Sequence, residues 1–102
     1  MNRGEIWYAE VGRKRLPVVV LTRTEVIDVR ALVTVAEVTT SIRGIGAEVD
    51  LDHATAGLAR PSVINCDGLH TVSKTALTTY VGSVADDTLD RVCAAVSYAL
   101  GC

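Results

Sequence analysis

A run of three cations, Arg13-Lys14-Arg15, is the densest charge in the sequence. It lies between Ile6–Val11 and Leu16–Leu21, which are rich in aromatic or β-branched residues that pack well on a pleated surface. Pro17 suits the start of the second stretch, where its missing N–H costs the sheet least. The pattern predicts a hairpin whose turn, Gly12–Arg15, holds the cations together at one end of a sheet. Such a turn is a candidate anion-binding site.

Further polar side chains fall where predicted strands end or bend. Thr39-Thr40-Ser41 is a hydroxyl cluster at the end of the predicted strand Ala31–Thr39. Asn65 and Asp67 alternate on a later strand, so both side chains are expected on the same face. His70 follows on the continuation of that strand, and a histidine in a phosphate cleft can serve as base or acid.

Each of these residues also has a structural interpretation. The cations can gather phosphate without taking part in catalysis. Thr39 can satisfy a backbone group at its strand end, and Asp67 can cap the bend at Gly68. A strand histidine such as His70 is often a partly exposed polar residue.

A small sheet must position these groups. Period-two alternation predicts the strand Ala31–Thr39. Further extended segments are predicted at Ala47–Leu51, at Pro61–Asp67 with a continuation through Leu69–Val72 past a bulge at Gly68, and at Tyr80–Val84. Arg23–Arg30 is predicted as a surface loop, and Ser73 as the cap of a brief helical turn over Lys74–Leu77.

One longer helix is predicted at Thr88–Leu100, capped by Asp86 or Asp87 and ended by Gly101. Its apolar stripe consists of Leu89, Val92, Cys93, Val96 and Leu100. The predicted fold is mainly β, with residues 1–102 forming one small antiparallel barrel with short helices, closed by the C-terminal helix.

Composition limits the possible functions. A length of 102 residues leaves room for one core, and a net charge of −2 does not by itself indicate nucleic acid. The three cysteines include no CxxC pair, so neither a metal site nor a disulfide framework is predicted, and Cys66 and Cys93 are expected to be reduced and buried. No apolar run approaches the ~20 residues of a membrane span, and no secretion leader is recognised. We therefore expect a cytoplasmic protein.

Three segments resemble the MazF/PemK family of toxin endoribonucleases. Arg3–Trp7 (RGEIW), followed by a turn and the Pro-led strand PVVVLT, is similar to the family's opening. Val35–Ser41 (VAEVTTS) is similar to the end of its third strand, and Gly57–Leu77 to its Ser-Val-Val-x-Cys-Asp block. The resemblance covers the whole chain and implies the SH3-like barrel that this family shares with the gyrase poison CcdB.

The resemblance implies RNA cleavage without metal or other cofactors. The 2′-OH attacks the neighbouring phosphate, leaving a 2′,3′-cyclic phosphate and a 5′-OH, while the enzyme moves protons and stabilises the extra charge. In the family, an arginine before the strand-two proline and a threonine ending strand three carry this role. Thr39 matches the threonine, but Leu16 stands at the arginine position, so the neighbouring Arg15 is the candidate, with Arg13 second.

Asp67 matches an acidic position that some family members use in catalysis or base contact, and completes the expected catalytic set. Residues expected to bind RNA are Arg13, Lys14, Thr40, Ser41, Arg43, Asn65 and His70. The resemblance further implies a homodimer that cuts single-stranded RNA, arrests translation and growth, and is held inactive by a cognate antitoxin. Two alternatives are a CcdB-like gyrase inhibitor and a non-catalytic barrel that binds RNA or protein.

Overall fold

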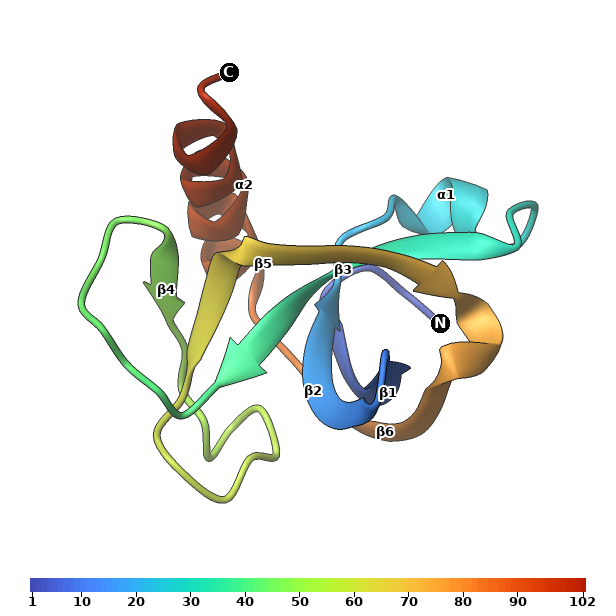
Figure 1. Cartoon of the computed structure of the whole chain (residues 1–102), viewed down its shortest axis with the longest axis horizontal. Coiled ribbons are helices and arrows are strands. Elements are labelled where there is room, and N and C mark those ends of the chain that lie inside the picture. The colour runs from blue at the N-terminus through green and yellow to red at the C-terminus, as the bar shows by residue number, and fades with distance from the viewer.

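The computed structural model describes residues 1–102 and shows a mainly β molecule with one long helix (Figure 1). Six strands pair antiparallel in the order β4-β5-β3-β2-β1-β6. The elements are β1 Glu5–Val11, β2 Lys14–Val20, α1 Thr24–Ile27, β3 Leu32–Thr39, β4 Glu48–Asp50, β5 Val63–Ser73, the 3₁₀ turn η1 Lys74–Ala76, β6 Leu77–Ser83 and α2 Asp86–Leu100. β3 and β5 run across the middle of Figure 1, and β1, β2 and β6 curve beneath them. The predicted fold class is confirmed.

β1 and β2 form the predicted hairpin, in unbroken register up to the pair Val11 and Lys14. The turn is tighter than predicted, because only Gly12 and Arg13 lie outside the pairing, and Lys14 and Arg15 belong to β2. Gly12 has φ 61°, in the left-handed region that the first central residue of a type II′ turn requires. Since the register is regular, successive β2 side chains leave the sheet on opposite faces.

β5 is one long strand interrupted by a bulge. Its register with β3 shifts between Ala36, which faces Leu69, and Glu37, which faces Asn65. Three residues of β5, including Gly68, therefore have no partner on β3. The bulge predicted at Gly68 is confirmed, and it is this bulge that redirects β5 beside the end of β3.

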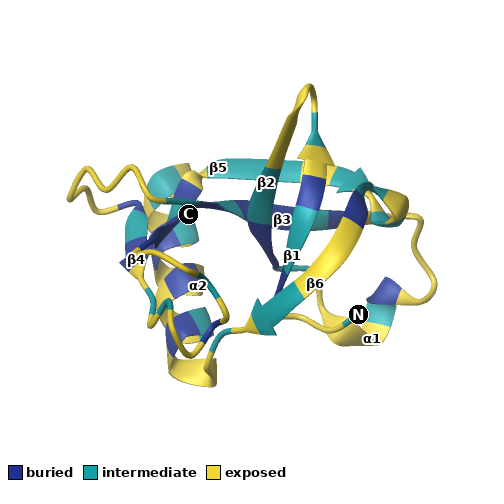
Figure 2. Cartoon of the chain, turned by 90° about the horizontal axis from the view of Figure 1, so that it is seen from below, coloured by how far each residue is buried: buried dark blue, intermediate teal, exposed yellow.

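The sheet has an apolar cluster on each face. The cluster facing α2 includes Ile6, Val19, Ala36, Val38, Ile64, Val92 and Ala95. The opposite cluster consists of Ala9, Val18, Val20, Ile27, Val33, Val35 and Leu77. Figure 2 shows buried residues along β3, which like β1 and β2 contributes to both clusters, with α2 at one end of the sheet. Even-numbered β3 residues from Ala36 onward thus face α2, and odd-numbered residues face away from it.

The helices differ from prediction in three respects. α2 begins at Asp86, and its N-cap is Ala85, which makes no side-chain hydrogen bond to the helix. The predicted carboxylate cap is therefore wrong. Asp86 and Asp87 instead lie in the first turn, where the helix dipole favours their negative charge. Arg23–Arg30 contains the short helix α1, because Ile27 is drawn into the core. Cys93 is exposed, contrary to prediction.

Other local predictions are confirmed. Gly101 ends α2 with φ 73°, and the Ser73 hydroxyl accepts a hydrogen bond from the N–H of Thr75 at the start of η1. Cys66 is buried as predicted. Neither helix has the length and apolarity needed to cross a bilayer.

Candidate active site

The sheet face opposite α2 becomes polar beyond Val35. The next outward residues of β3 are Glu37 and Thr39, and both are half-buried. Asn65 is the register partner of Glu37, and His70 is the register partner of Val35, so both extend the same face from β5. The fold thus places a carboxylate and a hydroxyl from β3 on the same face as an amide and an imidazole from β5, a strand that lies much later in the sequence.

Glu37 and His70 are in direct contact. His70 Nε2 and Glu37 Oε2 are 2.6 Å apart, and 32% of each side chain remains exposed. Glu37 was not among the residues predicted from the sequence. The signal that could have found it was the alternation of β3, because a glutamate follows two buried valines on the same face and must therefore lie at the edge of the apolar cluster.

The β5 bulge holds the amide beside this carboxylate. The Asp67 N–H donates to Asn65 Oδ1 at 3.0 Å, which fixes the Asn65 side chain. A Cβ on Gly68 would lie 2.9 Å from Glu37 Oε2 and 3.1 Å from Asn65 Nδ2, so both groups pack against the bare glycine. The Asp67 side chain is exposed. Asn65 therefore lies beside Glu37, the contact partner of His70, whereas Asp67 lies on the bulge with no partner on β3.

Thr39 lies at the rim of a separate cleft. Its hydroxyl accepts a hydrogen bond from the Ser41 N–H at 3.0 Å, which orders the turn after β3. The cleft has a volume of about 420 Å³ and is lined by Tyr8, Pro17, Val38, Thr39, Thr40, Leu58, Ala59, Arg60 and Ser62. Thr40 and Ser41 are exposed. The hydroxyl cluster predicted from the sequence is therefore accessible.

Arg15 leaves the sheet near this cleft and not on the Glu37 face. Its guanidinium lies over the Tyr8 ring, 4.3 Å from the ring centre, and Nη2 donates to the Thr79 hydroxyl at 3.1 Å. Arg13 and Lys14 are exposed at the turn beside it. The turn and its neighbouring strand thus present three cations to solvent, and Arg15 is the one whose position is fixed.

Leu16 points the opposite way from Arg15. It packs, half-buried, against the apolar cluster of the face that carries Glu37 and Thr39. The last register pair between β2 and β3 joins Val18 to Glu37, and continuing it by two residues places Leu16 opposite Thr39. The register between β1 and β2 is unbroken, so no one-residue shift brings the Arg15 side chain to the position that Leu16 occupies.

Arg43 is committed to the loop between β3 and β4. Its Nε contacts Glu48 Oε2 at 3.2 Å, and the N–H groups of Arg43 and Gly44 also donate to the Glu48 carboxylate. Desolvation alone would raise the pKa of Glu48, but these donors together hold the pKa below its ordinary value of 4.5. Half of the Arg43 side chain remains exposed, which leaves part of its guanidinium available for a ligand.

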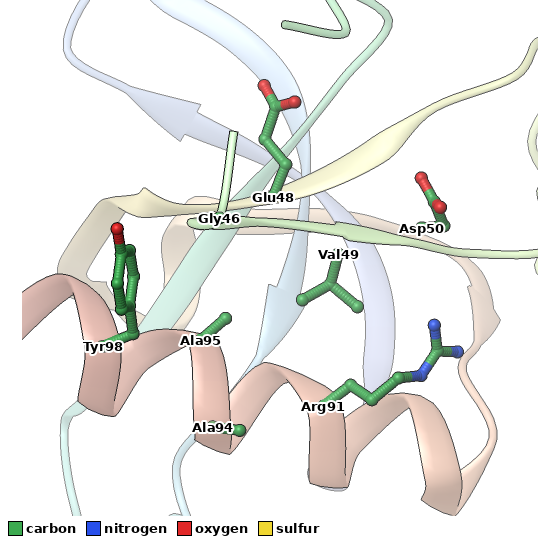
Figure 3. Close-up of a pocket in the computed structure, with 8 residues that line it drawn as sticks. All are labelled: Gly46, Glu48, Val49, Asp50, Arg91, Ala94, Ala95 and Tyr98. Atoms are coloured by element: carbon green, nitrogen blue, oxygen red, sulfur yellow. The ribbon is translucent and has the colours of Figure 1, made fainter. Parts of the chain in front are cut away.

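A groove between α2 and β4 lies apart from these groups (Figure 3). Val49 and Ala95 form its floor, and Arg91 and Tyr98 project from the helix at its two ends. None of the residues predicted to act on RNA lines it. We therefore place the candidate active site on the polar sheet face and the adjoining Thr39 cleft.

The remaining groups of chemical interest are the buried thiol of Cys66 and the possible metal ligands. Burial, reinforced by the charge of Asp67 and by Cys93, raises the pKa of the Cys66 thiol to about 11, so Cys66 is a neutral core residue and no nucleophile. The structure contains no group of three His, Cys, Asp or Glu residues that could hold a metal ion.

Comparison with known proteins identifies the class of protein to which this fold and site belong. A family model described as "PemK-like, MazF-like toxin of type II toxin-antitoxin system" matches residues 2–100. "Probable endoribonuclease MazF5" of Mycobacterium tuberculosis is 38% identical over 103 residues, covering 98% of this chain and 93% of the relative. "Probable endoribonuclease MazF2" of the same species is 31% identical over 102 residues and covers 100% of both chains.

Solved structures agree. "Mycobacterium tuberculosis toxin MazF-mt6" superposes with a TM-score of 0.89 at 33% identity, covering 95% of this chain and 96% of that one. "Endoribonuclease in complex with its cognate antitoxin from Mycobacterial species" gives a TM-score of 0.88 at 24% identity, covering 99% and 95%, and at that identity shows the fold alone. These matches define a toxin of the type II toxin–antitoxin class. The chain belongs to the PemK/MazF family of toxin endoribonucleases, and the family predicted from its sequence is confirmed.

Proposed function

We propose that this toxin cuts single-stranded RNA by attack of the 2′-OH on the adjacent phosphate, without metal, giving 2′,3′-cyclic phosphate and 5′-OH ends. The match to endoribonuclease relatives along the whole chain carries this proposal. The site supports it, because cations, hydroxyl groups and an imidazole can stabilise charge and move protons with no metal. The same relatives favour RNA cleavage over the gyrase-inhibitor alternative.

The proposed catalytic residues are Arg15, Thr39 and Asp67. Arg15 would bind the phosphate with the guanidinium N–H groups that Thr79 does not use, and Thr39 would donate its hydroxyl to a phosphate oxygen. Asp67 is exposed on the bulge, where it can contact a base or take a proton. RNA would be bound by Arg13, Lys14, Thr40, Ser41, Arg43, Asn65 and His70.

The toxin is further proposed to act in the cytoplasm as a homodimer whose grooves also bind its antitoxin. A structure of the same fold contains an endoribonuclease with its cognate antitoxin. An inhibitor of this surface must match both cations and apolar side chains, and a disordered acidic tail with a few apolar anchors does so. RNA and antitoxin are then expected to compete, with binding that weakens at higher salt.

Incubation of the protein with a long single-stranded transcript in EDTA tests the reaction. We expect fragments with 5′-OH ends, and Thr39→Val should slow cleavage while Thr39→Ser, which keeps the hydroxyl, should retain most activity. Fragments with 5′-phosphate ends, or strict dependence on added magnesium, would contradict the mechanism. Inhibition of gyrase supercoiling without RNA cleavage would favour the gyrase-inhibitor alternative.

A further inference from the structure

The contact between Glu37 and His70 is unusual for this chain. Although the sequence contains 10 basic and 12 acidic residues, only two ion pairs form, and the other is the loop contact of Arg43 with Glu48. The Glu37–His70 pair joins two strands at a short 2.6 Å separation on a half-exposed face. It borders the apolar cluster, where such a contact is stronger than in open water.

The contact with Glu37 places a hydrogen on one nitrogen of the imidazole. An ionised carboxylate has only acceptor atoms, so the Nε2 bonded to Glu37 must carry the hydrogen. Nδ1 of neutral His70 is then left with its lone pair free. Nδ1 has no hydrogen-bond partner in the protein. Every buried side-chain nitrogen in the structure does have a partner, so Nδ1 is not buried and is open to solvent or to a ligand.

The surroundings keep the carboxylate in this position. Asn65 and Gly68 flank it on the bulge, and a Cβ at position 68 would lie 2.9 Å from Oε2. Gly68 is not needed for backbone freedom, because its φ is not in the left-handed region. Its missing side chain instead leaves the space that the Glu37 carboxylate occupies. Thr39 follows two residues along the same face, about 7 Å further along β3.

We propose that His70 is the general base of RNA cleavage and that Glu37 is its positioning residue, an inference that rests on the proposed endoribonuclease activity. Nδ1 takes the proton of the 2′-OH as the 2′-oxygen bonds to phosphorus and the bond from phosphorus to O5′ breaks. The leaving O5′ takes a proton from water, and the imidazolium later releases its proton to solvent. Glu37 fixes the tautomer and orients the ring, as a carboxylate does for a histidine base.

Chemical rescue tests the base. His70→Ala should lower the single-turnover cleavage rate of a long single-stranded transcript by about 10²-fold or more, the usual contribution of a general base. Added imidazole should restore part of that rate, because the half-exposed site can admit it, whereas added chloride at equal ionic strength should not. His70→Gln, which can still donate to Glu37, should remain slow. The matched control is His53→Gln, which alters the only other histidine and should cut normally.

Glu37 is tested by charge and by length. Glu37→Gln should lower kcat by about tenfold or more with little change in KM, as does loss of other carboxylates that orient a functional histidine, and Glu37→Asp should recover part of the loss. In the long-range ¹H–¹⁵N spectrum, neutral His70 should show its proton on Nε2 in the wild type and on a mixture of the two nitrogens in Glu37→Gln. Glu25→Gln, which removes an exposed carboxylate on α1, should change neither the rate nor the His70 signals.

Gly68→Ala provides an independent perturbation. The added methyl group meets the flexible end of Glu37, so the protein should fold with a similar Tm but lose activity as Glu37→Gln does.

If the wild type does not cut RNA, the proposed function fails and this inference fails with it. If the wild type cuts RNA and His70→Ala cuts at the same rate, or imidazole does not restore its activity, the base assignment alone is wrong.

Discussion

Replacing Arg15 by alanine removes a guanidinium that two contacts hold in place. The group lies 4.3 Å from the centre of the Tyr8 ring and donates to Thr79 at 3.1 Å. An exposed cation–π contact and one hydrogen bond together stabilise the fold by about 1–2 kcal/mol. We therefore expect Tm to fall by about 4–8 °C for each kcal/mol lost, which leaves the variant folded at 25 °C.

The effect on cleavage should be larger. If Arg15 stabilises the phosphorane, its loss should cost about 10²–10³-fold in rate, as for other donors to a developing oxyanion. That range corresponds to about 2.7–4 kcal/mol in the activation barrier. Because the variant remains folded at the assay temperature, loss of structure cannot account for such a decrease.

Single-turnover cleavage of a transcript in EDTA, with thermal melting of the same samples, separates the two effects. Arg15→Lys keeps the charge without the planar fork and should recover only part of the rate. Arg13→Ala, at the exposed turn, is the matched control and should mainly weaken RNA binding. Wild-type cleavage by Arg15→Ala, with the expected fall in Tm, would show that Arg15 is structural. Loss of cleavage in Arg13→Ala alone would mean that Arg13 is the catalytic cation.

Three further predictions follow from the geometry. Leu16→Arg should restore cleavage to an Arg15→Ala background, because position 16 lies on the face of the polar cluster; a double variant as slow as the single one would contradict this. At about pH 8, a thiol reagent should quickly label the exposed Cys93 and Cys102 but label Cys66 only after unfolding, since burial raises the pKa of Cys66 to about 11; three fast thiols would contradict it. The pKa of Glu48 lies below 4.5, so its charge stabilises the fold above that pH and this contribution is lost as pH falls through the folded-state pKa. Urea unfolding of wild type and Glu48→Gln should therefore differ near neutral pH and converge in acid, whereas a constant difference would contradict the linkage.

Local patterns predicted much of the fold. The alternation in β3, the branched residues of β2, the bulge at Gly68 and the end of α2 at Gly101 were all readable, because each depends on neighbouring residues. The predicted start of α2 was wrong because an aspartate is favoured both at the N-cap and within the first turn of a helix. The sequence pattern does not distinguish these two positions. Cys93 was assigned to the core because its spacing fits an apolar stripe, but the packed side of α2 is set by Thr88, Val92 and Ala95.

The candidate site divides in the same way. The family, the basic hairpin and the hydroxyl cluster at Thr39 could be predicted from the sequence alone, since these are contiguous motifs. The contact of Glu37 with His70 across two strands could be found only in the folded chain, because the shift of register at the bulge sets which β5 residues lie beside β3. The fold also sets which side of the sheet each of Arg15 and Leu16 takes. Neighbouring strand residues always face opposite sides, and the length of the turn before β2 selects the side, so a turn longer by one residue would exchange their faces.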